Sequence, residues 1–124
     1  MKRMLAALAL AAVAAPAVAA PGDMSVATFL AKADALRARG PMALFSSDIG
    51  LLKAEATAGG QEYRTRLVGE RQRGTPSSCP PPRSAMNQNV LLTHLRSYPA
   101  AQRPRVTMRA AMADWFVRTY PCPR

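Results

Sequence analysis

The sequence has few of the side chains on which most enzymes and metal proteins depend. Its 124 residues include one histidine, two cysteines and seven acidic residues. One histidine and two cysteines cannot supply the four ligands of a structural zinc site. The chain also has no C-x-x-C, no Gly-rich phosphate loop, no H-E-x-x-H and no EF-hand pattern. We therefore expect no metal and no cofactor, and the length allows one small domain.

The single histidine offers little support for catalysis. His94 lies at the edge of the apolar surface of a predicted helix. A hydrolytic triad would need it beside a nucleophile and a carboxylate, and no nucleophile-elbow motif is present. The acids Asp34, Glu62 and Asp114 stand where ordinary helix ion pairs would place them, with Glu62 four residues before Arg66. The sequence therefore predicts a protein that is not an enzyme, with a structural histidine.

The beginning of the chain has the layout of a secretory signal peptide. Two basic residues precede an unbroken apolar run over residues 4–15. Ala17 and Ala19 supply the small side chains that signal peptidase requires. A run of twelve residues spans only about 18 Å as a helix, too short for a membrane anchor. We predict a cleaved signal at 1–19, a single domain at 20–124, export to the periplasm, and no transmembrane anchor in the mature form.

The rest of the chain shows helical spacing of apolar residues, without strand-like alternation or internal repeats. Four helices are predicted: from Ser25 to Gly40, from about Ser47 to Arg73, from about Asn87 to Tyr98, and from Thr107 to before Pro121. Three consecutive prolines at 80–82 forbid a helix between the second and the third. The third carries a wide apolar surface, so we expect it to be the most buried. The predicted fold is a small all-α bundle of about four helices.

Two adjacent glycines interrupt the pattern of the second helix. Gly59 and Gly60 cost about 2 kcal/mol relative to two alanines in a helix interior. They are compatible with a kink, with a break, or with a close crossing by another helix. The sequence leaves these three alternatives open.

The two cysteines give the strongest structural inference. Cys79 precedes the third predicted helix and Cys122 follows the fourth. If these helices form an antiparallel hairpin, the start of one lies beside the end of the other. An even number of cysteines in an exported chain favours pairing over a catalytic cysteine. We predict a Cys79–Cys122 disulfide that staples the C-terminal helical hairpin.

The charge is basic and unevenly placed. The predicted mature chain has fifteen basic and seven acidic residues, a net charge of +8. Residues 20–60 are balanced, whereas residues 61–124 hold eleven arginines, no lysine and three acids. A GC-rich genome would also favour arginine over lysine. Arginine pairs with carboxylates and phosphates, so an acidic protein or the anionic envelope surface fits as a partner. Nucleic acid is not expected, because the chain is exported and has no nucleic-acid-binding motif.

Three segments of the second half carry a family resemblance. They are SCPPP from Ser78, LLTHLRSYPAAQRP from Leu91, and AAMADWFVRTYPC ending at Cys122. Together they resemble the C-terminal signature of Rap/Tai-type immunity proteins. The resemblance implies a small periplasmic helical protein that neutralises a peptidoglycan amidase delivered by type VI secretion.

The leading hypothesis is thus a non-catalytic periplasmic binding protein of this immunity class, which blocks an amidase sterically. The candidate partner-binding residues are five arginines: Arg71, Arg73, Arg96, Arg103 and Arg105. The alternative is a periplasmic chaperone or stress protein, or an envelope-associated structural protein. A homodimer stays open, because the wide apolar face of the third helix could serve a dimer as well as a core.

Overall fold

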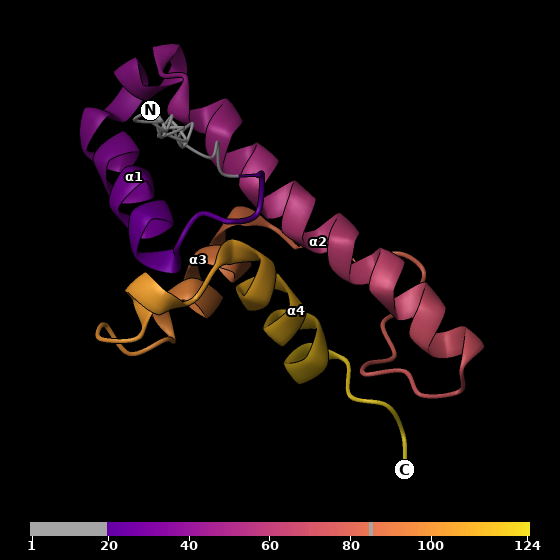
Figure 1. Ribbon diagram of the computed structural model, residues 1–124. Coiled ribbons are helices and arrows are strands. Elements are labelled where there is room, and N and C mark those ends of the chain that lie inside the picture. The colour runs from indigo at the N-terminus through magenta and orange to yellow at the C-terminus, as the bar shows by residue number, and fades with distance from the viewer. Residues whose placement is uncertain (1–19, 85) are drawn as a thin grey trace, which may run out of the picture.

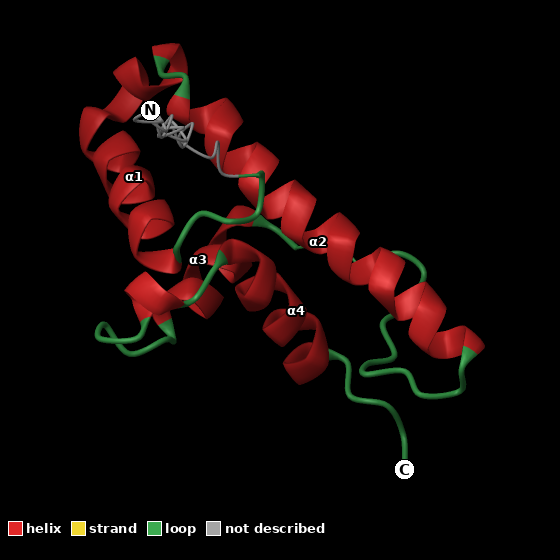
Figure 2. Ribbon diagram, in the orientation of Figure 1, coloured by secondary structure: helices red, strands yellow, loops and turns green. Residues whose placement is uncertain are grey.

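The computed structural model describes residues 20–84 and 86–124, so the predicted signal peptide lies outside the described residues. The elements are α1 (Val26–Arg39), η1 (Gly40–Phe45), α2 (Asp48–Gln72), α3 (Gln88–Arg96), η2 (Arg103–Arg105) and α4 (Met108–Thr119), where η marks a 3-10 helix. Figure 2 shows helices and loops throughout the described ranges. The only β-type pairing there is an isolated bridge between Ser25 and Thr107. The predicted all-α class is confirmed.

Helix ends follow the capping residues. The Ser25 side chain accepts a hydrogen bond from the amide of Thr28 at the start of α1. Thr107 caps α4 in the same way, through the amide of Ala110. A side-chain oxygen at this position satisfies an amide that the first helical turn leaves without a partner. Gly40, at a φ of 58°, ends α1 where the sequence predicted, and η1 follows it.

The long helix α2 organises the packing. Figure 1 shows α1 beside the first part of α2, joined to it through η1, and α4 lying against α2 farther along. One buried cluster joins all four α-helices, with Phe29 of α1, Leu95 of α3 and Met108 of α4 among its members. A second cluster lies between α2 and α4 and consists of Tyr63, Leu67, Trp115 and Phe116. No helix within the described ranges has both the length and the apolar character that crossing a bilayer requires.

The most buried helix is α4, so the expectation for the third helix was wrong. Helix α4 buries five of its twelve residues, whereas α3 buries only Leu92 and Leu95. The side chain of Val90 is exposed on α3. The reason is position: α4 packs along α2, while part of the apolar surface of α3 borders an open groove described below.

The glycine pair marks a close helix crossing. Helix α2 runs without a break from Asp48 to Gln72. A Cβ atom added at Gly59 would lie 2.9 Å from Cγ of Met112 and 3.2 Å from the carbonyl oxygen of Met108. A Cβ atom at Gly60 would meet only the terminal methyl of Met112, at 3.6 Å. Gly59 therefore lets α4 approach α2, and Gly60 has no such role.

The predicted disulfide is present. Cys79 and Cys122 are bonded, with their Cα atoms 4.9 Å apart. The bond joins the segment before α3 to the segment after α4, and the amide of Cys79 donates to the carbonyl of Tyr120 at 2.8 Å. Beside it, the buried hydroxyl of Ser78 shares a hydrogen bond with the phenol of Tyr63 on α2. The staple thus fixes the C-terminus and the loop against the end of α2.

Candidate binding groove

An apolar groove of about 970 Å³ opens on the surface of the described part of the chain. All four α-helices and η1 contribute to its lining. Its floor consists of buried side chains, namely Phe29, Leu52, Leu92, Met112, Trp115 and Phe116. This volume lies at the upper end of the range found for ligand pockets, about 300–1,000 Å³.

Small residues keep the groove open. Ala33 on α1, Ala43 on η1, and Ala56 and Gly60 on α2 line it. The turn through η1 sends α2 away from the end of α1, so that small side chains on the facing surfaces leave a gap. Larger residues at these positions would fill the space, as close-packed interiors require. The local sequence thus produces an open apolar surface between two helices.

The charged side chains that line the groove are all cationic. They are Arg37 on α1 and Lys53 and Arg64 on α2. Arg64 is held in place, because its guanidinium donates to Oγ of Ser84 at 2.6 Å and lies over the ring of Phe116 at 5.1 Å. Arg37 and Lys53 are exposed, and no ion pair within the described ranges includes them. An apolar floor with cations along its edge suits an anionic, amphipathic ligand.

The five predicted arginines do not form one surface. Arg71 and Arg73 lie at the end of α2, whereas Arg96, Arg103 and Arg105 lie at the end of α3 and in η2. Figure 1 places these two regions on opposite sides of the molecule. Neither group lines the groove.

Three of these arginines make internal contacts, the longest being the hydrogen bond that the Arg71 guanidinium donates to the carbonyl of Pro80 at 3.4 Å. Arg103 donates to the carbonyls of Tyr98 and Arg96, both at 2.9 Å, and so holds the turn between α3 and α4. Arg96 pairs with Asp34 on α1 at 2.8 Å. Arg105 is exposed, like the two arginines at the end of α2. Their role in partner binding stays a prediction.

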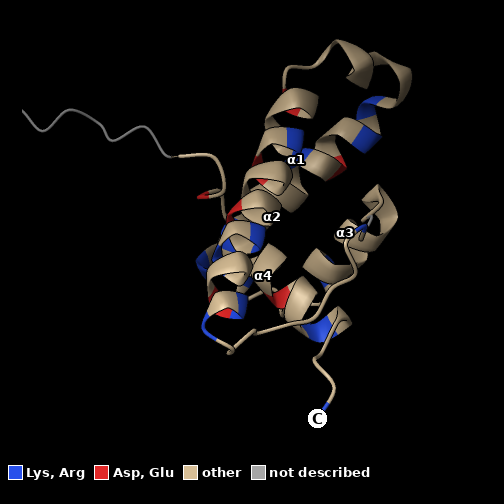
Figure 3. Cartoon of the chain, turned by 90° about the vertical axis from the view of Figure 1, so that its right-hand side faces the viewer, with Lys and Arg blue, Asp and Glu red and all other residues tan. Residues whose placement is uncertain are grey.

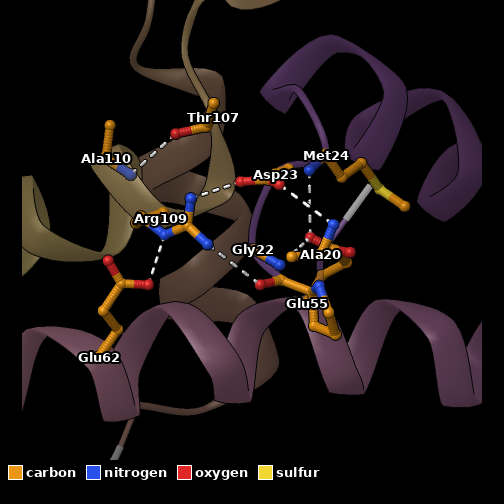
Figure 4. A network of polar contacts seen from close by, with 10 residues as sticks. Ala20, Gly22, Asp23, Met24, Glu55, Glu62, Thr107, Arg109 and Ala110 are labelled. Atoms are coloured by element: carbon orange, nitrogen blue, oxygen red, sulfur yellow. Dashed lines mark hydrogen bonds and ion pairs between the residues drawn. The ribbon is translucent and has the colours of Figure 1, made fainter. Parts of the chain in front are cut away.

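A polar network anchors the beginning of the described chain, as Figure 4 shows. Arg109 on α4 pairs with Asp23 and with Glu62, and these two carboxylates raise the pKa of its guanidinium. Glu55, only 6% exposed, accepts hydrogen bonds from the amides of Gly22 and Met24. The expected pair of Glu62 with its helix neighbour four residues on was wrong, because Arg109 reaches Glu62 from another helix. Arg66 pairs with Glu70 instead.

His94 connects α3 to α4. Its Nε2 donates to the carbonyl of Ala111 at 2.7 Å, since a carbonyl can only accept. The hydroxyl of Tyr98, one turn later, donates to Asp114 at 2.5 Å. The guanidinium of Arg118 lies over the Tyr98 ring, 5.8 Å from its centre. These contacts give His94 a packing role between the two helices.

The burial of His94 predicts a loss of stability under mild acid. Burial lowers its pKa below the ordinary 6.5, the Ala111 contact opposes this, and Arg118 lowers it further while Asp114 raises it. Because the folded-state pKa lies below the unfolded value, the unfolded chain binds more protons once the pH falls below about 6.5. This group therefore leaves stability unchanged at higher pH and reduces it as the pH falls.

The measurement is the thermal midpoint of unfolding followed by circular dichroism from neutral to mildly acidic pH. Keeping the pH above about 5 limits the contribution of the carboxylates. We expect the midpoint to fall with pH, and to fall less in His94→Gln, whose amide can still donate to Ala111. Identical pH profiles for the two proteins would refute this assignment.

Comparisons with protein-family models, with curated proteins and with solved structures found no match for this chain. The groove itself was not predicted from the sequence. Its cationic side chains come from two helices, α1 and α2, and the path of the chain through η1 places Arg37 along the same groove as Lys53. The one local feature that pointed to the groove was the presence of small residues on its lining, such as Ala33 on α1 and Ala56 on α2.

Proposed function

We propose that this chain is an exported, non-catalytic binding protein whose groove holds an acidic amphipathic segment of a protein partner. The observation that carries the proposal is the groove itself: a buried apolar floor with cations alone among its charged lining. An amphipathic helix in such a groove would bury its apolar face against the floor. Its carboxylates would meet Arg37 and Lys53 at the edge.

The chemistry of the groove supports binding rather than catalysis. Its described lining includes no carboxylate, histidine or thiol, the groups that most often supply a general base or an activated nucleophile. The exposed groups at its edge are ammonium, guanidinium, hydroxyl and amide groups. These groups recognise carboxylates and orient a ligand without reacting with it.

The disulfide supports a place outside the cytoplasm. Structural disulfides form and persist in oxidising compartments such as the periplasm. A periplasmic location agrees with the signal peptide predicted at residues 1–19. The partner class follows from the resemblance to Rap/Tai-type immunity proteins: a secreted peptidoglycan amidase, bound through an acidic surface and blocked sterically.

The proposal is tested with the secreted amidase encoded nearest to this gene, by titration calorimetry and by assaying hydrolysis of peptidoglycan. Thr57→Trp fills the groove and Lys53→Glu reverses a charge at its edge. We expect each to weaken binding at least about tenfold, which corresponds to about 1.4 kcal/mol. The loss of inhibition should follow the loss of binding.

Matched variants distinguish binding in the groove from binding at the exposed arginines Arg71, Arg73 and Arg105. Thr65→Trp places the same bulk on an exposed position of α2 that does not line the groove, and should bind normally. If Arg71→Glu/Arg73→Glu or Arg105→Glu abolishes binding while Thr57→Trp does not, the substituted arginines bind the partner and the groove proposal fails. Equal suppression of aggregation for many unrelated unfolded proteins, without amidase binding, would favour the chaperone alternative.

A further inference from the structure

The η1 segment projects an apolar tip at one end of the molecule. Met42, Leu44 and Phe45 have 65%, 79% and 84% of their surface exposed. The next most exposed large apolar side chain within the described ranges is Val68, at 53%. Each of these three neighbouring side chains thus has a larger exposed fraction than any other large apolar side chain in the described ranges. Such a cluster on an exported protein marks an interaction site.

The backbone of η1 presents these side chains together. In a 3-10 helix, residues three apart lie on the same side, which aligns Met42 with Phe45. Ala43, between them, lines the groove, so the large side chains point elsewhere. Gly40, with its positive φ, and Pro41 set the turn that brings η1 to the end of the α1–α2 pair, where Figure 1 shows it.

The charges beside this tip are in basic excess. Arg37 and Arg39 occupy the last turn of α1, directly before η1, and both are exposed. The neighbouring acids are already paired: Asp34 with Arg96 at 2.8 Å, and Asp48 with Lys32 at 3.3 Å. Figure 3 shows basic bands on α1 next to the η1 turn, which carries no charged residue. The tip is therefore apolar at its end and positive at its base.

We propose that the η1 tip docks this protein on the surface of an anionic phospholipid bilayer. Leu44 and Phe45 enter the boundary between headgroups and acyl chains, and Arg37 and Arg39 contact the lipid phosphates. A projecting apolar turn with exposed arginines beside it is the arrangement that suits an anionic bilayer. Long arginine side chains reach the headgroup level while their stems stay apolar.

A bilayer fits this tip better than a second protein chain does. A stable protein interface takes about 20–30 residues from each side, arranged over a broad surface. The tip offers three large apolar side chains on a single projecting turn, next to unpaired cations. A fluid bilayer accepts a projecting wedge without needing a complementary hollow. This surface shares Arg37 with the edge of the groove, whereas Leu44, Phe45 and Arg39 do not line the groove.

The test is flotation of the exported protein with lipid vesicles, comparing pure phosphatidylcholine with an equal mixture of phosphatidylcholine and phosphatidylglycerol. We expect binding to the anionic vesicles and little to the neutral ones. Leu44→Ser/Phe45→Ser should lower the partition coefficient at least about tenfold, because it removes the side chains that leave water. Arg39→Gln should lower it about fivefold, and only on anionic vesicles.

Controls use equal changes elsewhere. Val68→Ser/Val117→Ser removes two exposed apolar side chains from α2 and α4, and should bind as the unchanged protein does. Leu44→Trp should shift its fluorescence to shorter wavelength on anionic vesicles, over a constant signal from buried Trp115. Unchanged binding by Leu44→Ser/Phe45→Ser overturns the proposal. So does a dimer in light scattering that this double variant converts to a monomer, because a second copy would then cover the tip.

Discussion

Replacing both cysteines, as Cys79→Ala/Cys122→Ala, is expected to lower the free energy of unfolding by about 4 kcal/mol. The bond closes a loop with a sequence separation of 43 residues, and a loop of this length gives about that value in the chain-entropy model. The loss is large, because domains of this size are stable by only about 5–15 kcal/mol in total. Few single features of this chain contribute as much.

The structure also predicts which part loosens first. The staple holds the segment before α3, whose Ser77 and Ser78 hydroxyls bond to the phenol of Tyr63. Neither cysteine lies inside a helix, so the helical content of the folded variant should stay close to that of the oxidised protein. Hydrogen exchange should therefore rise first around residues 75–84 and after α4, while the amides within α1 and α3, which pack on each other, stay protected.

Chemical denaturation followed by circular dichroism measures the effect, with and without the disulfide. The unchanged protein in the presence of a reductant serves as the control, and should unfold at the midpoint of the double variant. Both cysteines are at least partly exposed, so losing the sulfur atoms themselves contributes little. A difference below about 1 kcal/mol would contradict the chain-entropy account of this disulfide.

The sequence predicted the features that depend on local rules. Ser25 and Thr107 cap helices because a hydroxyl beside the first turn satisfies a free amide, whatever the rest of the fold does. Gly40 ends α1 for an equally local reason. The disulfide was predicted because two cysteines in an exported chain have only each other as partners. The caps and the helix end required no knowledge of how the helices pack, whereas the disulfide prediction also assumed that the third and fourth helices lie side by side.

Features that depend on packing were missed or mistaken. Glu62 has Arg66 one turn away, yet it pairs with Arg109, because α4 brings that guanidinium closer. The groove depends on the direction in which α2 leaves η1, and no local rule fixes that direction. The exposure of Phe45 follows from the same turn. A helical pattern says which face of a helix is apolar, but not which part of that face a neighbour covers.

The glycine pair shows the same contrast between local rules and packing, and it gives a testable prediction. Both Gly59 and Gly60 lie inside α2, so an alanine at either position gains about 1 kcal/mol of helix propensity. Gly60→Ala should show this gain, because its new methyl would meet only the terminal methyl of Met112 at an ordinary distance of 3.6 Å. We expect the free energy of unfolding to rise by about 1 kcal/mol.

Gly59→Ala should do the opposite. Its methyl would lie 2.9 Å from Cγ of Met112 and 3.2 Å from the Met108 carbonyl, and the carbonyl belongs to the α4 backbone. Relief requires α4 to move off α2, which strains the Tyr63–Phe116 stack, whose ring centres are 4.9 Å apart. Overpacking of this kind costs about 1–3 kcal/mol, and the helix propensity gained offsets about 1 kcal/mol of it, so we expect a net loss of about 1 kcal/mol.

The two alanine variants are therefore expected to differ by about 2 kcal/mol in the free energy of unfolding, although each adds one methyl group and the two residues are adjacent. Thermal and denaturant unfolding measure this difference directly, and each variant is the control for the other. Met112→Ala in the Gly59→Ala background should recover part of the loss, because it removes the nearest clashing atom. If both variants gain stability equally, Gly59 does not mark the crossing, and the contact between α2 and α4 must be looser than described.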